Sequence, residues 1–183
     1  MKRLAILACA VSLVAVGCNE SINPVVPSGV VTLVAQLAGT SNVPPAGYLG
    51  GATALEAGAA GSVQVTMTPT TGGAYTANFA LSLKGLVTSG VLPTPLDNGS
   101  VIVAGYIHQG AAGAVGAAVV ALPISQTAPV VSPTGTVLVT ISGVTVTAAA
   151  ASGILANPAG YYFNLYSALN QNGVLRGQLV KQQ

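Results

Sequence analysis

The amino-acid sequence predicts an all-β fold, an antiparallel β-sandwich or Greek-key barrel of about eight strands. Run after run alternates apolar with polar residues, which is the period of a strand with one buried and one solvated face. The runs are rich in β-branched residues, and clusters of Gly, Pro, Asn and Ser separate most of them. These features together favour short antiparallel strands joined by turns.

The clearest pair of strands is expected to form a hairpin. The run Ser62–Thr68 alternates apolar residues with hydroxyl or amide residues, and Ala74–Leu83 places its aromatic residues and leucines on one face. Between the two runs, Thr71–Gly73 is a turn of hairpin length.

Further runs of the same character are also expected to be strands. They are Val30–Ala38, Ser100–His108, Ala118–Leu122, Thr136–Val146, Tyr161–Ser167 and Val174–Val180. The only helical candidate is Ala148–Leu155, which is short and contains Ser-Gly, so about one turn of helix is expected there. The apolar stretch Ala111–Leu122 is too short to span a membrane and is expected to be a turn that leads into a buried strand.

The N-terminal segment 1–17 resembles a bacterial lipoprotein signal peptide. Two basic residues precede the apolar run Leu4–Val16, which is shorter than the ~20 residues of a membrane-spanning helix. The segment runs into Gly17 and Cys18, and in such signals the cysteine becomes the acylated first residue of the mature protein. The sequence therefore predicts export and lipid attachment at Cys18 in the cell envelope, with an ordinary secretory signal and a secreted protein as the alternative.

Residues 18–29 are expected to form a Pro-rich tether, and residues 30–183 a single β domain. Cys9 is expected to be removed when the signal peptide is cleaved, and Cys18 is expected to be acylated. The exported domain therefore keeps no cysteine for a disulfide or a thiolate metal site.

The exported part carries little charge. The chain has five basic and three acidic residues, and without Lys2 and Arg3 the balance is 3 − 3 = 0. No basic patch remains to neutralise phosphates, so nucleic acid is not expected as a partner. Near-zero net charge also gives little electrostatic protection against self-association.

Catalysis is not expected, so the chain is predicted not to be an enzyme. The single histidine, His108, lies in Ala104–Gly113, where a β-patterned run meets a glycine-spaced turn. Asp97, Ser100 and His108 are the residue types of a catalytic triad, but no strand-turn-helix nucleophile elbow surrounds a serine. Catalysis by a pair of carboxylates is not expected either, because the domain contains only two acidic residues, Glu56 and Asp97.

Arg176 is the charged residue of most interest, because an alternating strand places it on one face with Val174 and Gln178. Three roles are open: pairing with a carboxylate, capping loop carbonyls, or holding the ends of the domain together. A structural role is favoured over ligand contact. Val43–Pro45 is expected at an edge or in a loop, where prolines stiffen a turn or form a binding ridge.

Three separated parts of the chain share a further pattern, and they occur in this order: Gly39–Pro45 after the first strand, Ala104–His108 in the middle, and Tyr162–Ser167 leading to Leu175–Leu179 at the end. These segments resemble the CHRD domain, a family named for the repeats of chordin and also found in secreted bacterial proteins. The closing Arg-Gly-Gln-Leu is the most specific piece. The resemblance covers most of Val30–Val180.

The departures from the family pattern bear on metal binding. The family typically has Glu where this chain has Asn42, and histidines where it has Tyr106 and Tyr166. A His-x-His pair on a strand could offer two imidazoles to one ion, with a third from a neighbouring strand, but this chain keeps only His108. No metal and no other cofactor is therefore expected, and His108 is expected to bond to backbone or to a tyrosine. The candidate site is a polar patch of Tyr106, His108, Asn164, Tyr166 and Arg176.

The sequence thus predicts a non-catalytic binding or structural module of the cell envelope, anchored by a lipidated Cys18. The expected partners are the membrane, through the lipid, and an envelope or extracellular protein. Two alternatives stay open. One is a metal-binding or redox β-sandwich protein that uses His108, and the other is a self-associating adhesion or matrix element with outer faces rich in Thr, Ser, Ala and Gly.

Overall fold

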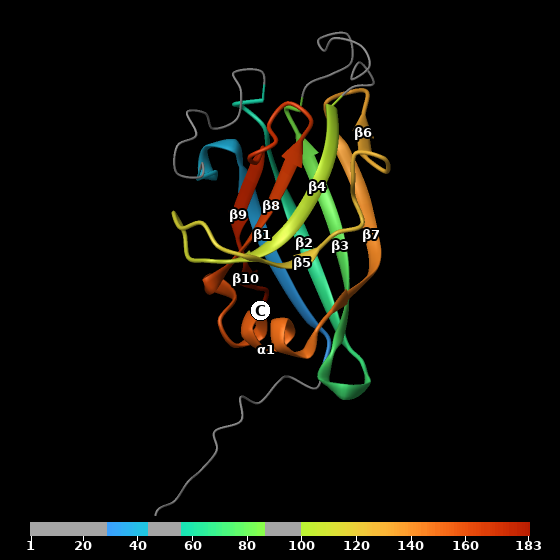
Figure 1. The fold of residues 1–183 in the computed structure, drawn as a ribbon, viewed down its shortest axis with the longest axis vertical. Coiled ribbons are helices and arrows are strands. Elements are labelled where there is room, and N and C mark those ends of the chain that lie inside the picture. The colour runs from blue at the N-terminus through green and yellow to red at the C-terminus, as the bar shows by residue number, and fades with distance from the viewer. Residues whose placement is uncertain (1–28, 44–55, 87–99) are drawn as a thin grey trace, which may run out of the picture.

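The computed structural model describes residues 29–43, 56–86 and 100–183, whose strands form one antiparallel sheet wrapped into a nearly closed barrel (Figure 1). The all-β class expected from the sequence is confirmed. A single curved sheet is found rather than two sheets packed face to face. Ten strands lie in the described part of the chain: β1 (Val31–Ala38), β2 (Ala60–Pro69), β3 (Tyr75–Lys84), β4 (Ser100–Gln109), β5 (Ala118–Ala121), β6 (Val130–Ser132), β7 (Val137–Val146), β8 (Tyr161–Ser167), β9 (Leu175–Gln178) and β10 (Val180–Lys181).

The strand order brings distant parts of the chain side by side. It runs β5-β4-β8-β9-β1-β2-β3-β7, while β6 extends the ladder on β4 and β10 pairs with β1. The first strand therefore lies between β2 and the last strands of the chain, and Ala38 faces Arg176 across the β1–β9 pairing. This arrangement places β4, β8 and β9 next to one another, and these three strands carry the candidate site.

Two details of the sheet differ from the sequence expectation. The run Val174–Val180 was expected to be one strand, but it is divided into β9 and β10 at Leu179. The Leu179 N–H donates to the carbonyl of Tyr161 at 3.0 Å and its side chain is fully buried. β9 pairs with both β8 and β1, whereas β10, after Leu179, pairs with β1 alone. β6 was not expected, because three residues are too few for a period of two to stand out from the sequence.

The core is formed by alternate residues of each strand. In the hairpin β2–β3 the apolar residues of both runs point inward, as the alternation predicted, and the turn at Thr71–Gly73 is a 3₁₀ turn. Inside the barrel, Phe79 from β3 stacks on Phe163 from β8, with ring centroids 5.9 Å apart. The outer faces of β2 and β3 carry hydroxyl, amide and small side chains, with Lys84 as the one charge.

One end of the barrel is covered by the helix α1 (Ala148–Ala156), which lies across the lower end of the strands (Figure 1). Its nine residues are more than the single turn that the sequence led us to expect. The Oγ1 of Thr147 caps its first turn by accepting from the Ala150 N–H at 3.3 Å. Ile154 is fully buried, so tertiary packing stabilises a helix that local sequence signals only weakly. In the described ranges, no helix has the length and apolarity that crossing a membrane requires.

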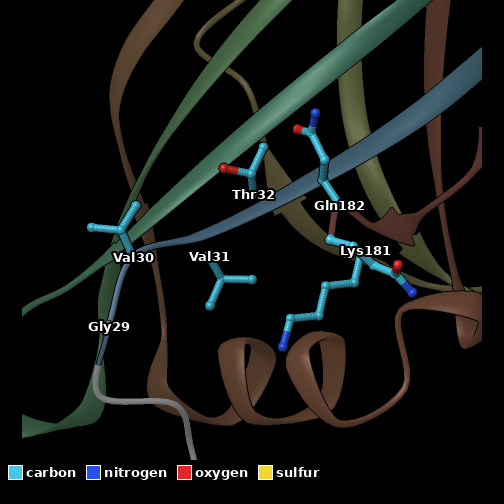
Figure 2. Close-up of a pocket in the computed structure, with 7 residues that line it drawn as sticks. Gly29, Val30, Val31, Thr32, Lys181 and Gln182 are labelled. Carbon is cyan, nitrogen blue, oxygen red and sulfur yellow. The ribbon is translucent and has the colours of Figure 1, made fainter.

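A hollow of about 370 Å³ lies at this end of the barrel, beside the first described residue, Gly29 (Figure 2). Val31 and Thr32 of β1 and Gln182 line it, and the side chain of Lys181 extends toward α1. The described chain therefore enters the fold at the end that α1 covers.

Several sequence predictions concern residues outside the described ones and stay predictions. They are the signal segment 1–17, the tether up to residue 28 with Cys18, the two prolines of Val43–Pro45, and Asp97 of the conceivable triad.

Candidate functional site

The outer face of β4, β8 and β9 carries the residues of the predicted polar patch. In the antiparallel register, Tyr106 lies opposite Asn164, and Asn164 lies opposite Arg176. Side chains two residues apart share a face, so His108 and Tyr166 join the same surface. The rings are in contact, because the Tyr106 ring centroid lies 5.6 Å from those of both His108 and Tyr166. The structure thus gathers the patch on one face.

A three-layer stack forms the buried side of the patch. The guanidinium carbon of Arg176 lies 3.5 Å from the ring centroid of Tyr162, and the imidazole of His108 stacks on the same ring at 4.9 Å and only 4° from parallel. Tyr162 and Arg176 are almost completely buried, at 2% and 3% exposure. A desolvated cation on an aromatic face gains about 2 kcal/mol, more than at an exposed site. The stack therefore fixes the one positively charged group of the patch, the Arg176 guanidinium, in a buried position on the sheet.

The hydrogen bonds of His108 define its tautomer. Nδ1 lies 2.9 Å from the carbonyl oxygen of Gly116, which only accepts, so Nδ1 carries the proton and donates. Nε2 then accepts from the hydroxyl of Tyr166 at 3.1 Å. Backbone and a tyrosine were the two partners expected for this imidazole, and the structure has both. Neither ring nitrogen is left over in this arrangement.

Burial keeps this pair uncharged. It lowers the pKa of His108, and the nearby positive charge of Arg176 lowers it further, while the bond to Gly116 opposes both effects. Burial also raises the pKa of Tyr166, against the opposing effect of a hydrogen bond from Asn164. At neutral pH the patch therefore presents a neutral imidazole and a neutral phenol.

A loop of residues 110–117, here called the covering loop, lies over the stack. Nη2 of Arg176 donates to the carbonyls of Ala111 and Ala114, at 3.2 Å and 2.6 Å. Of the roles considered for this arginine, capping loop carbonyls is the one the structure shows. A planar guanidinium suits the role, because it can stack on a ring and donate in its plane at the same time.

The covering loop is fastened at both of its ends. The Gly116 N–H donates to the Tyr162 hydroxyl at 3.2 Å, and Nε2 of Gln178 donates to the Gly110 carbonyl at 2.8 Å. A Cβ on Gly116 would lie only 1.5 Å from the carbonyl oxygen of Gln109, so only glycine fits there. The glycine at position 116 is therefore a packing requirement of this loop.

Asn164 connects the patch to the segment that follows β1. Its side-chain oxygen and that of Asn42 are buried and accept no hydrogen bond from the described residues. Both amides surround Gly173, which has φ +120°, and a Cβ there would lie 2.7 Å from Oδ1 of Asn42. Asn42 is held by donating to the Gly39 carbonyl at 3.2 Å. The position where the family typically has Glu thus packs beside the patch.

Sequence reasoning missed three contributors to this region. Tyr162 lies two residues before Asn164, so the period of two alone would have placed it on the patch face. Gln178 was placed on the face of Arg176, but not as a fastener of the loop. Glu56 was considered only for catalysis, whereas its fully buried carboxylate accepts from Ser167 at 2.6 Å and holds the turn after β8. No local signal marks a partner 111 residues away.

The residues of the patch differ in exposure, and its cation, Arg176, is 3% exposed. Asn164 is buried, while Tyr106, His108 and Tyr166 are half-buried and reach the surface of the patch. Within the described ranges, no three His, Cys, Asp or Glu side chains lie close enough to hold a metal ion together.

Replacing the guanidinium tests the role of the stack. We expect Arg176→Met to lower the free energy of unfolding by about 1.5–3 kcal/mol, because two carbonyls lose a charged donor and Tyr162 loses its cation. Chemical denaturation at pH 7 measures the change. Lys84→Met, at an exposed position on β3, is the matched control and should have little effect. Equal effects of the two substitutions would contradict the role given to Arg176.

Acidification should weaken the fold through His108. Its pKa in the folded chain lies below the ordinary value of about 6.5, so below that pH the unfolded chain binds the proton more readily. The free energy of unfolding should therefore fall as pH drops through about 6.5 toward the folded pKa. His108→Gln should flatten this part of the curve, since the chain has one histidine. An unchanged slope in the variant, measured by denaturation between about pH 7.5 and 5.5, would rule out this cause.

Comparison with known proteins agrees with this geometry. The family model described as the CHRD domain matches residues 33–179, which include most of β1 and all of β2 to β9. No curated protein and no solved structure matches the chain. Since the family match spans most of the sequence, the chain belongs to the CHRD domain family, a membership that indicates a non-enzymatic module.

Proposed function

We propose that this protein is a binding or structural module of the bacterial cell envelope, without catalysis of its own and anchored through a lipidated Cys18. One observation carries the non-catalytic part. The side chains that chemistry would recruit are already engaged, because His108 bridges Gly116 and Tyr166 and Arg176 holds the covering loop. Such a network is suited to presenting a fixed surface.

The geometry is compatible with anchoring from the N-terminus. The described chain begins at the barrel end that α1 covers, and β8 runs from there toward the opposite end, where Tyr166 lies (Figure 1). A tether that joins at Gly29 would leave Tyr166 and the turn after β8 facing away from a membrane. The surface offered to an envelope or extracellular partner is then the part of the patch that contains Tyr166 and the turn after β8.

The metal or redox alternative would need a change in this network. A metal on His108 needs a ring nitrogen, and Nδ1 and Nε2 are bonded to Gly116 and Tyr166. The neighbours Tyr106 and Tyr162 are phenols, which are weaker candidates than imidazole or carboxylate at neutral pH. The geometry therefore favours the binding or structural role.

Self-association is a second candidate, and one observation favours it. β7 ends the sheet, and on it Leu138 is 85% exposed beside the nearly uncharged outer face of β3. An exposed apolar residue on an edge strand is a common point of contact between copies of a chain. The occupant that fits an apolar, uncharged edge is a second copy that presents the same edge.

Cys18 provides the test of the anchor. The wild-type protein should fractionate with membranes and Cys18→Ser should not, because the acyl chains attach to that sulfur. Cys9→Ser is the matched control, since Cys9 lies inside the signal and should leave the fractionation unchanged. Membrane fractionation of both variants, with crosslinking to envelope proteins in intact cells, checks the proposal. Retention of Cys18→Ser in the membrane fraction together with an absence of crosslinked partners would contradict it.

Leu138 provides the test of self-association. If β7 edges meet, the mass of the chain in sedimentation equilibrium should rise with concentration. Leu138→Lys should restore the monomer, because two lysines would then face each other at the contact. Thr140→Lys, two residues further along the exposed side of β7, is the comparison at a site without an apolar side chain. A strictly monomeric wild-type chain at all concentrations counts against this candidate.

A further inference from the structure

The patch is open on one side. A hollow of about 390 Å³ lies beside its tyrosines, a size within the ~300–1,000 Å³ typical of small-molecule sites. Its walls come from β4, from the end of β8, from the connection between β5 and β6, and from the turn after β8. The lining residues are Val103, Ala104, Tyr106, Gln126, Tyr166 and Gln171. None of these residues is charged.

The two rings give the hollow an apolar, shaped wall. Tyr106 and Tyr166 meet at 78° with their centroids 5.6 Å apart, so the edge of one ring meets the face of the other. Both are half-buried, and their contacts with His108 hold them in place. Rings fixed in this way can contact the C–H groups of a ligand at low entropic cost.

The polar groups of the hollow are amides and phenols. Gln126 and Gln171 are exposed, and each side-chain amide both donates and accepts. The hydroxyl of Tyr166 is bonded to Nε2 of His108 and to Asn164, so this residue gives the hollow its ring, and the two glutamines supply the free donors and acceptors. Since burial raises the pKa of Tyr166, this phenol carries no negative charge at neutral pH.

The ligand that this surface fits carries no net charge. The one cation of the patch, Arg176, is 3% exposed, stacks on Tyr162 and donates to carbonyls of the covering loop. An anionic or cationic ligand would lose its hydration at the hollow and meet no counter-charge among the lining residues. A ligand with many hydroxyls would find both donors and acceptors there.

We propose that the hollow beside Tyr106 and Tyr166 binds a neutral carbohydrate. The C–H face of a sugar ring lies against the tyrosines, and its hydroxyls bond to Gln126 and Gln171. The inference rests on the proposed function and gives the binding module a ligand class. The same chemistry is found in a free oligosaccharide and in the glycan of an envelope polymer.

Titration calorimetry on the full chain in detergent tests this site. The probes are maltotriose, cellotriose and triacetylchitotriose, and at least one should bind with a Kd of about 1 mM or tighter. Gln126→Ala and Gln171→Ala should each weaken binding roughly threefold to tenfold through a lost hydrogen bond. Tyr106→Leu should weaken it at least as much, while Tyr106→Phe, which keeps the ring, should retain most of it.

Three comparisons make the result decisive. Gln36→Ala removes an exposed glutamine from β1, outside the hollow, and should leave binding unchanged. Trigalacturonate, a charged trisaccharide, should bind more weakly than the neutral probes. Insoluble cell-wall glycan should retain the wild-type chain if the source is an envelope polymer and should not if the source is a free sugar.

Two results would overturn the inference: no binding of any neutral probe, or equal binding by the Gln126, Gln171 and Gln36 variants. These failures are separable from failure of the proposed function. One result is that the chain binds none of the three sugars, yet fractionates with membranes only when Cys18 is present and crosslinks to an envelope protein. This result would support the proposed function and contradict the carbohydrate ligand. The opposite result is that the chain binds sugar through Gln126 and Gln171 but fractionates with membranes independently of Cys18. This result would support the carbohydrate ligand and contradict the lipid anchor.

Discussion

The burial of the Arg176 guanidinium on the outside of the barrel is the constraint around which the patch is built. A charge at 3% exposure needs partners that replace water, and here they are the face of Tyr162 and two loop carbonyls. Each partner fixes another element: Tyr162 belongs to β8 and stacks on His108 of β4, and the carbonyls belong to the covering loop. One cation thereby connects three strands and a loop that are distant in sequence.

A second buried charge organises the neighbouring turn. The carboxylate of Glu56 is fully buried and accepts hydrogen bonds from Ser167 and Asn170, so it holds the chain that leads from β8 to β9. Asn42 and Asn164 meet around Gly173 in the same turn. Arg176 and Glu56 thus fix loops beside the patch, and the residues that line its open side carry no charge.

The absence of charge on the accessible side chains of the patch connects the structure with the proposed binding role. His108 has its proton on Nδ1 and accepts on Nε2, and burial disfavours its charged form. An imidazole bonded on both sides in this way supports its neighbours, and the half-buried Tyr106 and Tyr166 are held where a ligand could reach them. A surface of rings and amides favours recognition of neutral, hydroxyl-bearing groups over ion binding or proton transfer.

The sequence by itself determined the fold class, most of the strands and the members of the patch. Period-two alternation is a local signal, and residues two apart, such as Tyr106 and His108, necessarily share a face. The same local logic could not foresee the length of α1, the division of the last run at Leu179, or the partners of Arg176 and Glu56. These depend on contacts between residues far apart in the sequence, such as Glu56 and Ser167, 111 positions apart, which only the closing of the sheet brings together. Tertiary structure alone decided that the covering loop lies over the stack, because its carbonyls come within reach of Arg176 only when β9 lies beside β8.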